Sequence, residues 1–186
     1  GSICTTRVIA GVGVPQLSAV LEVAEAIKGS GVPIIADGGI RYSGDIVKAL
    51  VAGANTIMAG GLFAGTEESP GETTFFDGRK VKSYRGMGSI EAMKEGSASR
   101  YGHTKDDLAS KSTPEGVEAL KEVAGSVKET LENLTGGIRA GLGYLGAECL
   151  DELKERARYI QVSPAGQRES GTHDVIEVKR SDFTRS

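Results

Sequence analysis

The chain has 186 residues and a formal net charge of −3 at pH 7, with an expected pI of about 5.5. This balance excludes a basic face for nucleic acid and a polybasic patch for a membrane surface. No apolar run approaches the length of a membrane span. Cys4 and Cys149 are far apart in the sequence and do not make a disulfide framework, so we expect a protein of the reducing cytoplasm.

The first third of the chain predicts helices and strands in alternation, from apolar residues at helical spacing and from short apolar runs. The predicted elements are, in chain order, a helix over Pro15–Lys28, a buried strand over Val32–Ala36, a helix over 44–52 with Ser43 as its cap, a buried strand over Asn55–Ala59 and a short helix at 62–64. This order is typical of an α/β fold with a parallel sheet.

The rest of the chain is less regular. A hairpin is predicted over about 73–84 around the Asp77-Gly78 turn. A polar flap over about 90–125 is longer than ordinary connections, so we expect it to be mobile, and either functional or disordered. The remaining predictions are helices at 117–123, 126–142 and 150–157, a short strand at 158–162, and a tail over the last twenty residues.

Glycine motifs follow both predicted strands, Asp37-Gly38-Gly39 after the first and Gly60-Gly61 after the second. The carboxyl ends of parallel strands are where α/β folds bind ligands, and glycines there leave backbone N–H groups open to a phosphate. The Asp37 carboxylate could accept hydrogen bonds from ribose hydroxyls. Either glycine motif alone indicates no more than a tight turn. Two consecutive motifs of matching design favour a ligand.

Cys4 lies in a turn-prone run of glycine and hydroxyl residues just before a helix start, where a thiolate can be stabilised. A nucleophile and an ordinary structural cysteine both remain open there, whereas Cys149, on a helix face, indicates a buried structural cysteine. Arg100 and Tyr101 in the flap form a pair that could hold and activate a water. Their spacing alone favours a solvated pair.

Taken together, eight sequence strings resemble one family, the inosine-5′-monophosphate (IMP) dehydrogenases. They are GSICTTR at 1–7, GVGVPQ at 11–16, IADGGIRYSGDI at 35–46, ESPGE at 68–72, YRGMGS at 84–89, RY at 100–101, PEGVE at 114–118 and GGIRAG at 136–141. The resemblance implies a single (β/α)8 TIM barrel domain, of which residues 1–186 would supply only the C-terminal portion: the last two barrel strands, the flap and the tail.

The resemblance also implies a reaction, the oxidation of IMP to xanthosine 5′-monophosphate (XMP) with NAD+. Cys4 would attack the C2 carbon of IMP and form a covalent thioimidate, which water then hydrolyses. Arg100 would act as the general base with Tyr101 aiding it, and Thr6 would position the water. Glu115 would contact the purine and relay protons.

The binding residues follow from the same resemblance. Ser2, Gly39, Gly60, Gly61 and Tyr84 would hold the phosphate, and Asp37 would bind the ribose. Gly86, Met87, Gly88 and Glu115 would contact the base, and Gly38 would be a further substrate-binding residue. A potassium ion would be held by Gly1 and Cys4, together with Glu169, Ser170 and Gly171 of a neighbouring subunit. That arrangement implies a homotetramer.

Two alternatives remain open on the sequence. The first is a GMP reductase, which uses NADPH and shares the cysteine loop and the phosphate glycines. The second is an inactive nucleotide-binding fragment. Because only two of eight barrel strands are expected here, we predict that this chain alone is inactive without the N-terminal part of the barrel.

Overall fold

The computed structural model describes residues 1–101 and 113–175. It divides the chain into two compact units, residues 1–156 and 157–186, which are described separately. Part of the predicted flap, at 102–112, and the end of the predicted tail, at 176–186, lie outside the described residues.

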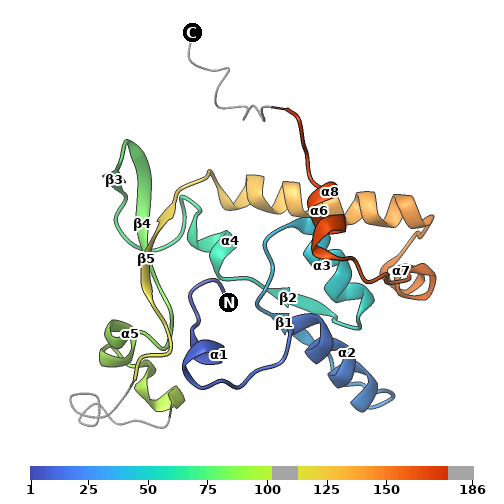
Figure 1. Ribbon diagram of the computed structural model, residues 1–186, viewed down its shortest axis with the longest axis horizontal. Coiled ribbons are helices and arrows are strands. Elements are labelled where there is room, and N and C mark those ends of the chain that lie inside the picture. Colours follow the sequence, from blue (N-terminus) through green and yellow to red (C-terminus); the bar gives the residue numbers. More distant parts are fainter. Residues whose placement is uncertain (102–112, 176–186) are drawn as a thin grey trace. The chain divides into compact units, whose positions relative to one another are not determined.

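The first unit contains the predicted α/β arrangement (Figure 1). Strands β1 (Ile35–Asp37) and β2 (Thr56–Met58) pair in parallel, and helix α3 (Ser43–Val51) connects them. Helix α2 (Gln16–Ala26) precedes β1. The sequence therefore predicted this α-β-α-β order correctly.

The core beside β1 and β2 is small, because most of its buried side chains are alanines, which bury little apolar surface. Its buried members are Val20, Ala36, Ala49, Ala52 and Ala54, with Ile34, Ile40 and Ile57 packed against them. The prediction of buried strands was wrong, since Ile35 is 57% exposed and Met58 is 50% exposed. A sheet of two strands has too little neighbouring structure to cover both of its faces.

Helix α3 begins differently from the prediction. The carboxylate of Asp45, not the hydroxyl of Ser43, satisfies the backbone at its start, accepting from the N–H groups of Arg41 and Tyr42 at 3.0 Å each. Ser43 instead packs against Gly137 of helix α6 (Val127–Leu145). Helix α6 also contacts α4 (Gly61–Ala64) and α7 (Leu150–Arg156) (Figure 1).

A three-stranded antiparallel sheet forms the other part of the first unit. The predicted hairpin is confirmed as β3 (Thr74–Phe76) and β4 (Arg79–Arg85). Asp77 and Gly78 take positive φ values of 48° and 74°, as a two-residue hairpin turn requires. The predicted helix at 117–123 is wrong, because β5 (Glu118–Glu122) pairs there with β4.

The described parts of the predicted flap are ordered into regular elements. They comprise helix α5 (Ile90–Lys94), the 3-10 helix η1 (Ser97–Tyr101) and strand β5. In the second unit the predicted strand at 158–162 is absent from the described residues, and helix α8 (Pro164–Glu169) occupies the start of the predicted tail. Among the described residues no helix is both long and apolar enough to cross a membrane.

Candidate active site

The loop that carries Cys4 docks on the chain segment around Gly116. The N–H of Thr5 donates to the carbonyl of Glu115 at 2.9 Å, and the N–H of Val117 donates to the carbonyl of Ile3 at 3.1 Å. Cys4 and Gly116 thereby form an antiparallel bridge. This contact leads directly into helix α1 (Thr6–Ile9), so Cys4 precedes a helix start as the sequence predicted.

A chain of hydrogen bonds joins Cys4, Thr6 and Glu115. The Cys4 thiol donates to Thr6 Oγ1 at 3.3 Å, and Thr6 Oγ1 donates to Glu115 Oε2 at 2.7 Å. Hydrogen bonding to the Thr6 side chain, and next to its backbone, lowers the pKa of the Cys4 thiol, against the opposing effects of burial and of the Glu115 charge. Since the thiol is also exposed, it combines the two properties of a reactive cysteine.

Four of the predicted phosphate-binding residues meet at the start of α4. The hydroxyls of Ser2 and Tyr84 lie 3.4 Å apart. A Cβ atom placed on Gly60 would be 3.0 Å from the Tyr84 hydroxyl, and one on Gly61 would be 3.1 Å from Ser2 Oγ. Larger residues at 60 and 61 would fill the space between these hydroxyls and the backbone.

The predicted ribose-binding residue Asp37 ends strand β1 and is exposed. Gly38 and Gly39 follow with φ values of 102° and 76°, which only glycine adopts without strain. A Cβ on Gly38 would lie 3.8 Å from the Gly1 nitrogen, so this motif adjoins the Cys4 loop. The sequence missed Gln16, whose side-chain amide donates to the Asp37 carbonyl at 2.8 Å.

The predicted base-contacting residues lie directly beside Cys4 and Glu115. The Gly86 N–H donates to the Val117 carbonyl at 3.0 Å, and the Glu115 N–H donates to the Gly88 carbonyl at 3.0 Å. The Ser97 hydroxyl donates to the Met87 carbonyl at 2.6 Å, which ties η1 to this loop. Arg100 and Tyr101 belong to η1, but their side chains are outside the described part of the structure, so their role stays a prediction.

The predicted potassium ligands are divided between the two units. Gly1 and Cys4 belong to the first unit, and Glu169, Ser170 and Gly171 lie at the end of α8 in the second. Residues 169–171 have ligand atoms that suit a cation, because the last turn of a helix presents carbonyl oxygens without hydrogen-bond partners in the helix. Among the described residues no cluster of three or more His, Cys, Asp or Glu side chains could hold a metal. The site itself stays a prediction.

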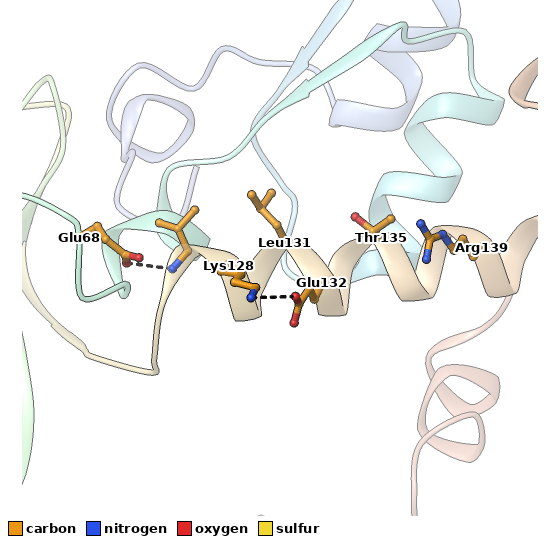
Figure 2. Close-up of a pocket in the computed structure, with 7 residues that line it drawn as sticks. Glu68, Lys128, Leu131, Glu132, Thr135 and Arg139 are labelled. Carbon is orange, nitrogen blue, oxygen red and sulfur yellow. Dashed lines mark hydrogen bonds and ion pairs between the residues drawn. The ribbon is translucent and has the colours of Figure 1, made fainter.

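Two open cavities lie near α6, and they differ in their relation to the site. One of about 480 Å³ is lined in part by Gly60 and Tyr84. The other, of about 570 Å³, runs along α6 (Figure 2) and contains none of the predicted site residues; its lining is Glu68, Val127, Lys128, Leu131, Glu132, Thr135 and Arg139. The predicted buried position of Cys149 is also wrong, since its side chain is exposed.

The structure thus brings an exposed cysteine with a lowered pKa and a glycine-lined pair of hydroxyls into one α/β unit with two parallel strands. Residues 1–173 match the family model described as IMP dehydrogenase / GMP reductase domain. The chain belongs to this family.

Curated relatives agree with the family match. The chain is 51% identical over 181 residues to the inosine-5′-monophosphate dehydrogenase of Escherichia coli, covering 97% of this chain and 37% of that protein. It is 54% identical over 175 residues to the enzyme of the same name from Streptococcus pyogenes, covering 94% of this chain and 36% of that protein. The chain thus spans little more than a third of the length of these relatives.

The fold is similar to a solved structure of the same family. The crystal structure of a GMP reductase from Trypanosoma brucei, in complex with guanosine 5′-monophosphate, superposes with a TM-score of 0.83 at 45% sequence identity. The match covers 95% of this chain and 35% of that one.

Proposed function

We propose that this chain is the catalytic portion of an enzyme that oxidises IMP to XMP with NAD+. The observation that carries the proposal is the hydrogen-bonded series Cys4–Thr6–Glu115. It supplies a thiol with a route for its proton, in a family whose curated members at 51–54% identity are named as IMP dehydrogenases.

The first half of the reaction starts with loss of the Cys4 proton. As the thiol proton moves to Thr6 Oγ1, the hydroxyl proton of Thr6 moves to Glu115, which leaves a thiolate. The sulfur then bonds to the C2 carbon of IMP, and the hydrogen on that carbon departs with its electron pair. Bound NAD+ supplies the acceptor for this hydride. The exposed position of Cys4 leaves room for the purine on the sulfur.

The second half is hydrolysis of the resulting thioimidate. Arg100 removes a proton from a water that Thr6 positions and Tyr101 helps to hold, and the oxygen bonds to the C2 carbon. The carbon–sulfur bond then breaks, its electron pair returns to Cys4, and XMP is released. Glu115, protonated in the first half, returns its proton through Thr6 to the Cys4 thiolate, which restores the starting state.

The substrate would lie across the residues that meet around the Cys4 loop. Its phosphate binds among Ser2, Gly38, Gly39, Gly60, Gly61 and Tyr84, its ribose at Asp37, and its base along Gly86, Met87, Gly88 and Glu115. The carbonyls of Gly1 and Cys4, with Glu169, Ser170 and Gly171 of a neighbouring subunit, would hold potassium, which steadies the Cys4 loop. The whole enzyme would be a homotetramer of (β/α)8 barrels.

The second candidate is reduction of GMP with NADPH, which the similarity to the Trypanosoma brucei GMP reductase favours. The two functions are separated by incubating the complete expressed protein with IMP and NAD+, or with GMP and NADPH. The proposal requires NADH formation and a nucleotide adduct on Cys4 in the first mixture, measured by absorbance and by intact mass. Consumption of NADPH in the second mixture alone would establish the reductase.

A Cys4→Ala variant and a Cys149→Ala variant make a matched pair of controls, since both thiols are exposed. Adduct formation must vanish in the first and persist in the second. Failure of the complete protein to form an adduct with either nucleotide would leave the binding-fragment alternative.

A further inference from the structure

Lys82 is a charged residue buried inside the first unit. Its side chain lies in strand β4 and the residue is 3% exposed. The ammonium donates to three backbone carbonyls, those of Ser69 at 2.6 Å, Glu67 at 2.7 Å and Thr66 at 3.4 Å. Burying an ammonium is costly unless its donors are satisfied, so this arrangement fixes the loop of residues 66–69 on β4.

The loop of residues 66–69 is in turn fastened to α4. The Thr66 hydroxyl donates to the Phe63 carbonyl at 2.7 Å, and the Ser69 hydroxyl donates to the Ala64 carbonyl at 3.0 Å. On its other side, the Glu68 carboxylate accepts from the Val127 N–H at 2.9 Å (Figure 2). Lys82 is therefore linked to α4 through the loop of residues 66–69.

The same two elements carry opposite sides of the hydroxyl cluster. Residues 82 and 84 point to the same side of β4, because side chains alternate along a strand. The Tyr84 hydroxyl lies over the backbone of Gly60, where a Cβ would come within 3.0 Å of it. Lys82 thus holds β4 at the spacing from α4 that places the Tyr84 hydroxyl beside Gly60.

We propose that Lys82 is a positioning residue that sets the spacing between the Tyr84 hydroxyl and the backbone of Gly60, and thereby the affinity for the phosphate group of the nucleotide. This inference rests on the proposed function. Lys82 does not touch the nucleotide itself; it acts through the loop of residues 66–69 and through Tyr84.

The test is a double-mutant cycle with Lys82→Met and Tyr84→Phe, made in the complete expressed protein, with binding of IMP and of inosine measured by calorimetry. Lys82→Met should weaken IMP binding about tenfold or more, since small displacements in a site have large effects. Inosine binding, which involves no phosphate, should be unchanged. In the Tyr84→Phe background the loss caused by Lys82→Met should largely disappear.

Lys80→Met is the matched control, because Lys80 lies on the same strand and is exposed; it should leave IMP binding unchanged. If Lys82→Met does not fold, Lys82→Gln, which keeps two N–H donors, replaces it in the same cycle. Equal IMP affinity in wild type and variant overturns the proposal, as do fully additive losses or an equal loss for inosine. A wild-type protein that binds no IMP overturns the proposed function and this inference with it.

Discussion

Thr6 carries a single hydroxyl proton, and two neighbours compete for it. In the structure that proton points to Glu115, while the Cys4 thiol donates to the same oxygen. A Cys4 thiolate requires Thr6 to donate to sulfur instead. The two demands are compatible when the Glu115 carboxylate takes up a proton as Cys4 loses one. Nucleophile and carboxylate are therefore linked through one hydroxyl.

Replacing Thr6 by valine tests this linkage at the nucleophile. Thr6→Val keeps the shape of the side chain but removes the hydroxyl that lowers the pKa of the Cys4 thiol. With that hydrogen bond lost, the thiol pKa should rise, so less thiolate is present at neutral pH and the midpoint of alkylation moves to higher pH. Iodoacetamide labelling across a pH series, resolved by peptide mass, measures it. Cys149 in the same sample is the internal control, and an unmoved Cys4 midpoint would contradict the expectation.

Glu115→Gln tests the other end of the series. The amide is nearly the same shape and can still accept the Thr6 hydrogen bond, but it takes up no proton at neutral pH. Loss of a positioned proton acceptor lowers turnover by about 10²-fold or more, while IMP binding should change little. The comparison of kcat with the equilibrium Kd for IMP decides it. Equal losses in both quantities would make Glu115 a binding residue only.

At the scale of elements, helix α6 depends on glycines where it crosses α3. A Cβ on Gly137 would overlap the hydroxyl oxygen and the Cβ of Ser43, and one on Gly141 would lie 3.1 Å from Val47. These two glycines, one helical turn apart, let the helices approach closely. Glycine has a low helix propensity, and the close packing of α6 on α3 offsets the resulting loss of stability.

Gly137→Ala should therefore destabilise the protein by about 1–3 kcal/mol through overpacking. Gly136 precedes it in the same helix and would place its Cβ in open space. Gly136→Ala should instead stabilise by about 0.5–1 kcal/mol, because alanine loses less backbone entropy than glycine in a helix. Urea unfolding of both variants gives the comparison. Equal effects of the same sign would show that α3 and α6 do not press on each other at Gly137.

Sequence periodicity predicted α2, β1, α3 and β2 because each carries its own pattern. It did not predict α5 and η1 within the expected flap. It also failed at 117–123, where Glu, Ala, Leu and Lys favour a helix but pairing with β4 decides the structure. The glycine motifs and Cys4 were found because their residue types are distinctive. Gln16 and Lys82 were missed because each binds backbone carbonyls at least thirteen residues away, and such contacts leave no sequence signal.

At the scale of the whole molecule, the exposed sheet of β1 and β2 determines how the chain should associate. Strands β1 and β2 form a two-stranded sheet, and the chain spans 37% of the length of its Escherichia coli relative. Ile35 and Met58 in these strands are 57% and 50% exposed. Apolar side chains next to unpaired strand edges favour association with further strands.

The 186-residue chain purified by itself should consequently self-associate, and its sedimentation coefficient should rise with concentration. The double substitution Ile35→Thr and Met58→Thr removes apolar surface from the sheet, while threonine still favours the strand conformation. It should therefore shift the chain toward the monomer. Tyr144→Thr on α6 is the control, because Tyr144 is 94% exposed but lies outside the sheet, and it should leave association unchanged. A chain that stays monomeric at every concentration would show that this sheet needs no further strands to cover it, and the expected dependence on the rest of a barrel would then be wrong.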